Sequence, residues 1–429
     1  MTTDEKQSGL GLVANSSSAF WKYWAAFTTG RTGAGVTAVA LPLLALTVLN
    51  VSNFEAGMLT VASYAPVVLI GLPAGVVVRR YYLRGLQITM DIVRAVAVLT
   101  IPLAAWWDVL TLSHLLVVAF VVGLAGSLFD VANLTFLPQV VSKNELISRN
   151  GLLSGTEAAT GLLGPSLGGI LVQVLGAASS IVVNAFAYLA SAAFLSRIPP
   201  TPKLGEPADE ELGFFQQVWD GLHYVLRHPV IRPAVIVASA LNFASGAILA
   251  VTAPFLVRTL ELPAAAVGVV LAIDGLGAII GAFITSRLVE RWGDARAIRV
   301  ATAIGAVLSL AMPLAVTGLA PVIFGFGLGV FGAGVALFSV VARSHRQTVS
   351  PPELLSRVMA SVRFISWSAI PVGAAVAGVL AEVIAPRAGL VLACVAAFVA
   401  PVVLWASRVR HLQNLVDAED AEDAERATV

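Results

Sequence analysis

Residues 142–149 read SKNELISR and residues 350–357 read SPPELLSR, so a polar octapeptide recurs 208 residues later in a mostly apolar chain. Each copy precedes a long apolar stretch. The same offset brings Arg84-Gly85 onto Trp292-Gly293, and residues 164–169 onto 372–377. Such a repeat predicts that the chain consists of two copies of one ancestral design.

The composition is typical of an integral membrane protein. Of the 429 residues, 58% are hydrophobic and 12% are charged, and soluble globular proteins carry about twice that charged fraction. The net charge of +1 gives no reason to expect a nucleic-acid partner. A single cysteine excludes an intramolecular disulfide. The sequence contains no phosphate-binding loop and no His-Glu-x-x-His motif, so we expect neither an enzyme nor a cofactor or metal.

Twelve stretches are long and apolar enough to cross a bilayer, which takes about 20 residues in a helix. They lie near 20–49, 55–78, 85–107, 112–136, 151–174 and 177–196, and near 232–256, 264–288, 297–317, 320–342, 358–383 and 387–408. Together with the repeat, they predict an all-α membrane protein with twelve transmembrane helices in two six-helix, pseudo-symmetric halves.

Polar segments divide the chain further. We predict a loose N-terminal tail at 1–19, a six-helix bundle at 20–196, a linker at 197–231, a second bundle at 232–408 and an acidic tail at 409–429. The linker contains an amphipathic segment, GFFQQVWDGLHYVLRHP. Its apolar face is predicted to lie on the membrane surface; the face consists of Phe214, Phe215, Val218, Trp219, Leu222 and Leu226.

Lys and Arg are concentrated in alternate loops. The basic loops contain Arg79, Arg80 and Arg84; Lys143 and Arg149; Arg287, Arg291 and Arg296; and Arg343, Arg346 and Arg357. Short loops rich in Lys and Arg stay on the cytoplasmic side. We therefore expect both termini and the linker to be cytoplasmic in a cell inner membrane.

The octapeptides have a local interpretation. Ser142 with Glu145, and Ser350 with Glu353, have the spacing of a capping box at a helix start. Capping does not require the arginine at the eighth position. Arg149 and Arg357 are therefore candidates for salt bridges that change with conformation.

The sequence resembles the major facilitator superfamily, in particular the branch of bacterial exporters that contains enterobactin and macrolide efflux proteins. The similar segments cover almost the whole chain: VALPLLAL (39–46), GLPAGVVVRR (71–80), DIVRA (91–95), FLPQVVSKNELISRNGLLS (136–154), GLLGPSLGG (161–169) and SRVMASVRFISW (356–367). The resemblance implies alternating access, in which two six-helix domains rock about a central cavity, and export driven by proton antiport.

Within the fifth span, Gly164-Pro165-x-x-Gly168-Gly169 is similar to the motif that marks antiporters in this superfamily. Glycines on a helix allow another helix to approach closely. Proline removes a backbone donor and bends the helix. We expect this helix to lie where the halves slide.

The loop after the second span departs from the superfamily pattern Gly-x-x-x-Asp-Arg-x-Gly-Arg-Arg. The chain has Gly75, Arg79 in place of Asp, Arg80, Tyr82 in place of Gly, Leu83 in place of Arg, and Arg84. The Asp normally helps to latch the halves on the cytoplasmic side. Arg79 is expected either to pair with Glu353 or Glu145, or to serve only as a positive-inside anchor.

Ionisable residues at membrane depth are usually functional. Asp274 lies roughly ten residues into its span, which is about 15 Å deep and near the bilayer midplane. We predict Asp274 as the proton-coupling carboxylate, with Glu157 as the alternative and packing as the competing explanation. Arg31 and Glu157 are predicted to form an ion pair. Asp91 and Arg94 are spaced to bridge one another near a span end.

The predicted central cavity is lined by spans one, four, seven and ten. Asn133 and Asn242 are expected among its polar contacts, because asparagine facing lipid is unfavourable. The function expected is export of a moderately hydrophobic antibiotic, macrolide or siderophore-like compound by a monomer in exchange for protons. The alternatives are a proton-coupled uptake symporter and a membrane sensor or lipid-handling protein that has lost transport.

Overall fold

The computed structural model describes residues 3–49, 53–200, 214–261, 264–316 and 320–415. These residues form α-helices, two short 3-10 helices and one π-helical turn, and no strand occurs among them. The acidic C-terminal tail from 416 onward and residues 201–213 of the predicted linker lie outside the described residues. Two compact units account for the chain, and each is described separately below.

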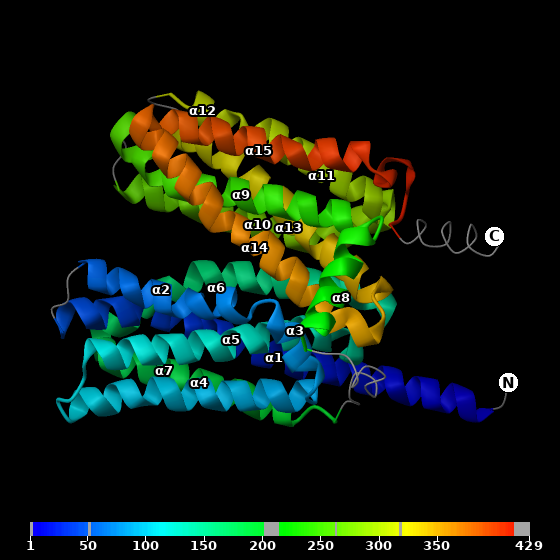
Figure 1. Cartoon of the computed structure of the whole chain (residues 1–429), viewed down its shortest axis with the longest axis horizontal. Helices are drawn as coiled ribbons and strands as arrows, with labels where there is room; N and C mark the ends of the chain where they lie inside the picture. Colours follow the sequence, from blue (N-terminus) through cyan, green and yellow to red (C-terminus); the bar gives the residue numbers. More distant parts are fainter. Residues whose placement is uncertain (1–2, 50–52, 201–213, 262–263, 317–319, 416–429) are drawn as a thin grey trace. The chain divides into compact units, whose positions relative to one another are not determined.

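Unit 1 comprises residues 1–146, 159–221 and 350–361. Its helices are α1 (Thr3–Thr47), α2 (Asn53–Ile70), α3 (Pro73–Arg79), α4 (Leu83–Trp106), α5 (Leu112–Val140), most of α6 (Leu146–Leu175) and α7 (Ala177–Ser196) (Figure 1). In unit 1, α7 packs against α1 and α4, while α5 packs against α2 and α4. Small and aliphatic side chains such as Ala40, Leu44 and Ile101 fill the core.

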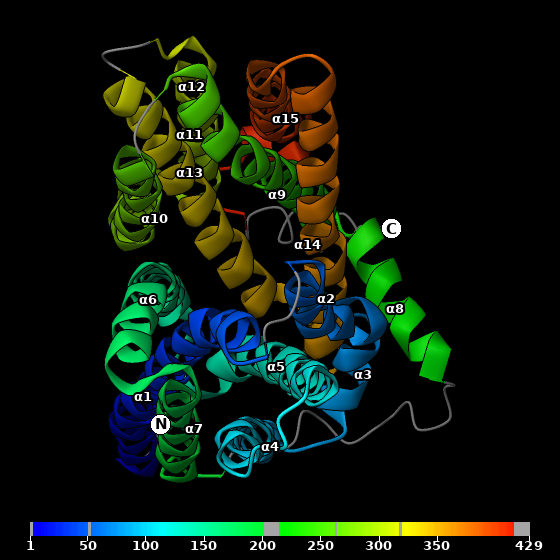
Figure 2. The ribbon, with the colours of Figure 1, turned by 90° about the vertical axis from the view of Figure 1, so that its left-hand side faces the viewer.

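Unit 2 comprises residues 147–158, 222–349 and 362–429. Its helices are α9 (Ile231–Pro254), α10 (Ala264–Trp292), α11 (Asp294–Ser309), α12 (Ala311–Leu314), α13 (Ala320–Val349), most of α14 (Pro352–Val383) and α15 (Pro386–Ala406). Within it, α10 packs against α13, α9 against α15, and α11 against both α13 and α15 (Figure 2). The helix α8 (Phe214–Arg227) precedes α9, and its residues are divided between the two units.

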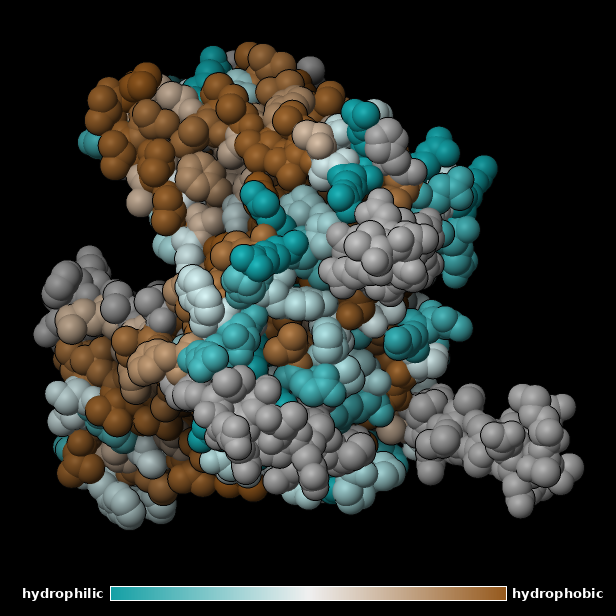
Figure 3. All heavy atoms as spheres, turned by 45° about the vertical axis from the view of Figure 1, so that its right-hand side comes forward, coloured by the Kyte–Doolittle hydropathy of each residue, from teal (hydrophilic) through white to brown (hydrophobic). Residues whose placement is uncertain are grey.

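Ten helical segments in the described part of the chain are long and apolar enough to cross a membrane. They coincide with the third to twelfth predicted spans, and the first two predicted spans coincide with α1 and with α2 followed by α3. Their outward faces carry exposed apolar side chains, for example Phe186 and Val395 (Figure 3). Such faces are stable in hydrocarbon, which confirms the prediction of a helical membrane protein.

Two details of the predicted spans were wrong. Helix α1 begins at Thr3, so the segment predicted as a loose tail is helical; the first proline of the chain is Pro42, and nothing earlier forces a helix to end. The predicted span 55–78 is interrupted after Ile70, and α3 begins at Pro73. Proline favours the first turn of a new helix, because its missing N–H would have no partner there.

The predicted glycine motif of the fifth span forms a close helix contact inside unit 1. A Cβ placed on Gly164 would lie 2.9 Å from Cα of Gly35 on α1, and a Cβ on Gly168 would lie 3.0 Å from Cα of Val36. Gly169 differs, because nothing lies within 4 Å of its Cβ position. The side chain of Pro165 is outside the described set. Gly164 and Gly168 therefore make the helix contact that the motif predicts.

We expect Gly164→Ala to reduce the yield of folded protein, because the new methyl group would force α1 and α6 apart. Overpacking of this kind typically costs about 1–3 kcal/mol. Gly169→Ala is the matched control, one turn away in the same motif, and should leave the yield unchanged or raise it slightly. Fluorescence-detected size-exclusion chromatography measures both. Equal yields of the two variants would show that the close approach is not required.

Candidate functional site

Unit 2 contains a cavity of about 340 Å³ between α6, α9, α10 and α13. Its polar lining is formed by Ser154, Glu157, Ser245, Thr252, Asp274, Ser339 and Arg343. Aliphatic and aromatic side chains, including Ile248, Leu249, Leu328 and Phe331, form the rest of the wall. A mainly apolar cavity with a few convergent charges is the usual form of a small-molecule site.

Asp274 projects from α10 into this cavity and lies against α13. A Cβ placed on Gly332 would be 2.5 Å from Oδ1 of Asp274 and 3.2 Å from its backbone oxygen, so the glycine provides the space for the carboxyl group. Among the described residues, Asp274 has no hydrogen bond or ion pair. A hydrogen bond to a neighbouring helix therefore does not explain this residue within the described part of the chain.

Glu157 and Arg343 line the same cavity as Asp274. Glu157 comes from α6 and Arg343 from α13, so three helices place two carboxylates and one guanidinium around one space. The sequence predicted Glu157 and Asp274 as separate candidates for one role. It missed Arg343, which counted only as a positive loop residue, because helix periodicity does not reveal which neighbour a residue faces.

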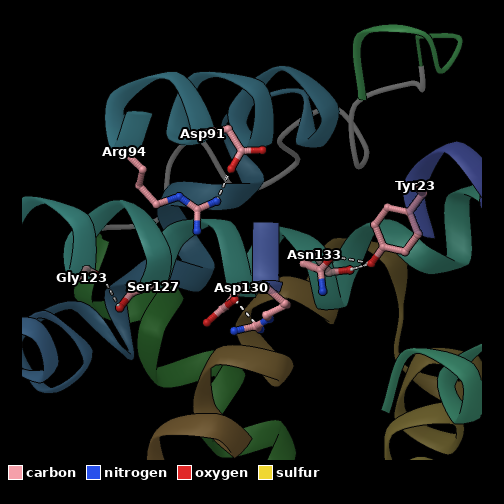
Figure 4. A network of polar contacts seen from close by, with 8 residues as sticks. Tyr23, Asp91, Arg94, Gly123, Ser127, Asp130 and Asn133 are labelled. Atoms are coloured by element: carbon pink, nitrogen blue, oxygen red, sulfur yellow. Dashed lines mark hydrogen bonds and ion pairs between the residues drawn. The ribbon is translucent and has the colours of Figure 1, made fainter. Parts of the chain in front are cut away.

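Arg31 forms an ion pair inside unit 1. Its Nη2 lies 2.9 Å from Oδ1 of Asp130 on α5, and both side chains are partly accessible (Figure 4). Its guanidinium also lies 5.3 Å from the ring centre of Phe27, one turn earlier on α1. The predicted pair of Arg31 with Glu157 joins residues of different units and stays a prediction.

Asn133 and Asn242 both make hydrogen bonds within their units. The Tyr23 hydroxyl donates to Oδ1 of Asn133 at 2.5 Å, beside the Arg31–Asp130 pair (Figure 4). The Asn242 amide donates to the backbone oxygen of Ser366 at 2.8 Å. Their predicted place in a cavity lined by spans one, four, seven and ten stays a prediction.

Asp91 and Arg94 form the predicted bridge on α4, which is confirmed. The pair is buried, and the Ser191 hydroxyl donates to the second oxygen of Asp91 at 2.7 Å. The Arg94 guanidinium lies 4.3 Å from the ring centre of Phe129 and 4.5 Å from that of Tyr188. Figure 4 shows the pair itself, and these contacts join α4 to α5 and α7, which gives the pair a structural role.

Arg357 occupies a buried junction in unit 1 with a side chain 1% exposed. Its Nη2 donates to Oε1 of Gln217 at 3.0 Å, and its Nη1 lies 3.9 Å from Oδ2 of Asp220, both on α8. The neighbouring Ser356 hydroxyl donates to the backbone oxygen of Gly75 at 2.8 Å. The eighth residue of the second octapeptide thus has an acidic partner in the linker helix. That this salt bridge changes with conformation stays a prediction.

The three arginines in the loop after the second span differ in burial and in their contacts. Arg79 is buried and Arg80 is exposed. Arg84 donates to the backbone oxygens of Leu195 and Ser196, at 3.0 and 2.5 Å, and so ties α4 to the end of α7. The predicted pairing of Arg79 with Glu353 or Glu145, and a salt bridge of Arg149, stay predictions.

Only one of the two predicted capping boxes is present. The backbone N–H of Ser142 donates to the Glu145 carboxylate at 3.4 Å, and its hydroxyl reaches the same oxygen at 3.0 Å. The Ser350 hydroxyl has no hydrogen-bond partner among the described residues, so the second box was wrong. Helix α14 begins at Pro352, which places Glu353 too early in the first turn for the box.

Comparisons with known proteins agree with this architecture. The sequence profile of the Major Facilitator Superfamily matches residues 23–348. The multidrug efflux pump Tap of Mycolicibacterium fortuitum is 27% identical over 379 residues, covering 84% of this chain and 88% of Tap. The enterobactin exporter EntS of Salmonella typhi is 25% identical over 272 residues, covering 62% of each chain.

The solved structures that resemble this chain have the same fold. An outward-facing structure of a bacterial homologue of the iron transporter ferroportin has a TM-score of 0.75, at 16% identity, and covers 91% of this chain and all of that one. The described part of the chain contains no group of His, Cys, Asp and Glu residues that could hold a metal ion. The profile match, the relatives and the fold together show that the chain belongs to the Major Facilitator Superfamily and is a membrane transporter, not an enzyme.

Proposed function

We propose that this transporter exports a moderately hydrophobic small molecule, such as an antibiotic, a macrolide or a siderophore-like compound, in exchange for protons. The observation that carries the proposal is the cavity in unit 2, where Asp274 and Glu157 face a mostly apolar space. Export is favoured over uptake because Tap is named an efflux pump and EntS an exporter.

The proposed exchange cycle assigns the proton to Asp274. Its carboxyl group lacks a hydrogen-bond or ionic partner among the described residues, so protonation breaks no contact there. A proton taken up from the outside neutralises the carboxylate, and its release to the cytoplasm restores the charge. Glu157 is the second candidate carrier in the same cavity. Antiport results when the transporter takes up a proton and a substrate molecule in alternation and so exchanges one for the other.

The proposed setting is the inner membrane, with both termini cytoplasmic and a monomer as the transporting unit. The alternate distribution of Lys and Arg in the loops supports this orientation. The partners are then a small-molecule substrate, protons and the lipid bilayer.

An efflux assay tests the proposed function. Cells of a strain that lacks its own efflux pumps are loaded with labelled macrolides, other antibiotics or siderophores, with and without this transporter. We expect lower accumulation of at least one compound in its presence, and a protonophore should abolish the difference. Accumulation that rises when the transporter is present would indicate uptake. A difference that survives the protonophore would exclude coupling to the proton gradient.

We expect Gly332→Ala to reduce proton-driven transport while the protein stays folded. The added methyl group would lie 2.5 Å from Oδ1 of Asp274, so the carboxyl group has to leave its position. Gly378→Ala on α14 is the matched control, because nothing lies within 4 Å of its Cβ position. Transport rates in proteoliposomes with an imposed pH gradient compare the two. Equal rates would show that the position of Asp274 is not critical.

A further inference from the structure

The linker helix α8 presents an apolar stripe to its surroundings. Phe215 is 84% exposed, Trp219 59% and Leu226 46%. These residues are spaced by four and seven positions, which places them on one side of a helix. Val218 and Leu222 of the predicted apolar face are only half-buried, and the side chain of Phe214 lies outside the described set. Aromatic residues this exposed on a short helix suggest an interaction surface.

The opposite side of α8 packs against the protein. Gln217, Gly221 and Val225 follow one another at four-residue intervals and are buried. A Cβ on Gly221 would lie 2.6 Å from Cβ of Arg357, so α8 and the first turns of α14 lie side by side (Figures 1 and 2). The exposed stripe is thus the outer face of a helix whose inner face is already fixed.

The position of α8 along the chain determines what covers the stripe. Helix α8 ends at Arg227, and the next candidate membrane span begins at Ile231. The connection reaches at most about 14 Å even if extended, and the interfacial zone of a bilayer is about 5–8 Å thick on each side. The C-terminal end of α8 is therefore held next to the membrane surface. Arg227 and Arg232 are both exposed at this point and carry the charge that anionic headgroups attract.

We propose that α8 is a lipid-binding helix, whose stripe of Phe215, Trp219 and Leu226 lies among the headgroups and upper acyl chains of the cytoplasmic leaflet. Arg227 and Arg232 bind the phosphates of anionic lipids. Arg357 connects this helix to α14 through Gln217 and Asp220. Helix α8 then anchors the linker to the membrane surface and is attached to the spanning helix α14. The proposed transport function does not require this anchoring role.

Spin labels on the full-length protein in nanodiscs test the lipid contact. Cysteines at Phe215 and Trp219 are compared with Gln216→Cys, an exposed polar neighbour outside the stripe, in a Cys394→Ser background. We expect the first two labels to be accessible to oxygen and protected from a water-soluble nickel chelate, and the third to show the reverse. Nickel accessibility like that of Gln216→Cys would overturn the proposal. Protection of both labels from both reagents would also overturn it, because protein would then cover the stripe.

A second arm tests the charges. In nanodiscs of phosphatidylcholine with a quarter phosphatidylglycerol, the labels should be buried more deeply than in phosphatidylcholine alone. Arg227→Gln combined with Arg232→Gln should remove that difference. Labels that respond equally to both lipid mixtures in the parent protein would show that anionic headgroups are not bound.

The connection through Arg357 needs its own measurement. Arg357→Gln should increase amide hydrogen exchange in residues 214–221 severalfold, since it removes the guanidinium that holds the inner face of α8. Arg84→Gln is the matched control, because Arg84 binds backbone oxygens of α7 in the same unit. Exchange in 214–221 that is unchanged in the Arg357 variant, or raised equally in both, would disprove the connection.

Discussion

Replacing Asp274 with Asn is expected to abolish export driven by a pH gradient, while exchange of substrate across the membrane at equal pH continues. Asparagine keeps the size of the side chain and fits the space left by Gly332. Its amide group cannot take up or release a proton near neutral pH. Coupling is therefore lost and binding is kept. Proteoliposomes with an imposed pH gradient measure the first rate, and counterflow of labelled substrate measures the second.

The control for this substitution is Asp108→Asn. Asp108 is an exposed carboxylate in the loop after α4 with a backbone φ of 58°, a conformation that asparagine also tolerates. This variant should transport at the parental rate. Full pH-driven export by a folded Asp274→Asn protein would assign the proton to another group, and Glu157→Gln would then be the next variant to examine.

Neutralising either partner of the Asp91–Arg94 pair is expected to produce the largest loss of stability among single substitutions in unit 1. Removing one partner leaves the other charge buried, which typically costs about 3–5 kcal/mol. Arg94→Gln leaves the Asp91 carboxylate with only the Ser191 hydroxyl. It also removes the cation between the rings of Phe129 and Tyr188. Folded yield and thermal unfolding in detergent measure the effect.

Two further variants distinguish the effect of breaking the Asp91–Arg94 pair from a general effect of removing any charge. The double variant Asp91→Asn/Arg94→Gln should recover part of the lost stability, because no uncompensated charge remains. Arg31→Gln breaks a pair whose side chains are 33% and 16% exposed, so water compensates the remaining carboxylate and the loss should be smaller. If Arg94→Gln and Arg31→Gln lower the melting temperature equally, burial of the Asp91–Arg94 pair has no special energetic role.

The sequence predicts the helices well because each spanning segment is a long apolar stretch, and the bilayer enforces a helix on any such stretch. The predicted helix boundaries were wrong at two places where the bilayer does not determine where a helix begins or ends. The polar residues before position 20 continue α1 because no proline interrupts them. The second span breaks at Pro73, whose role as a helix start depends on its surroundings.

The candidate site could be predicted only in part. Depth along a span was enough to single out Asp274, and the absence of a basic neighbour on its own helix was readable from the sequence. The convergence of Asp274, Glu157 and Arg343 depends on how α6, α10 and α13 are rotated, which one helix does not reveal. The partners of Arg31 and Arg357 were missed for the same reason, since Asp130 and Asp220 are distant in sequence.

Unit 1 is built from residues that are far apart in the chain, and this affects the order in which the protein can fold during synthesis. Unit 1 includes residues 350–361, although its other residues end at Gly221. The ribosome therefore has to make another 140 residues beyond Gly221 before Arg357 and its neighbours are available to the first unit. During that interval Gln217 and Asp220 on the inner face of α8 have no Arg357 guanidinium to bind, so this part of the first unit is completed only after most of the second half has been synthesised.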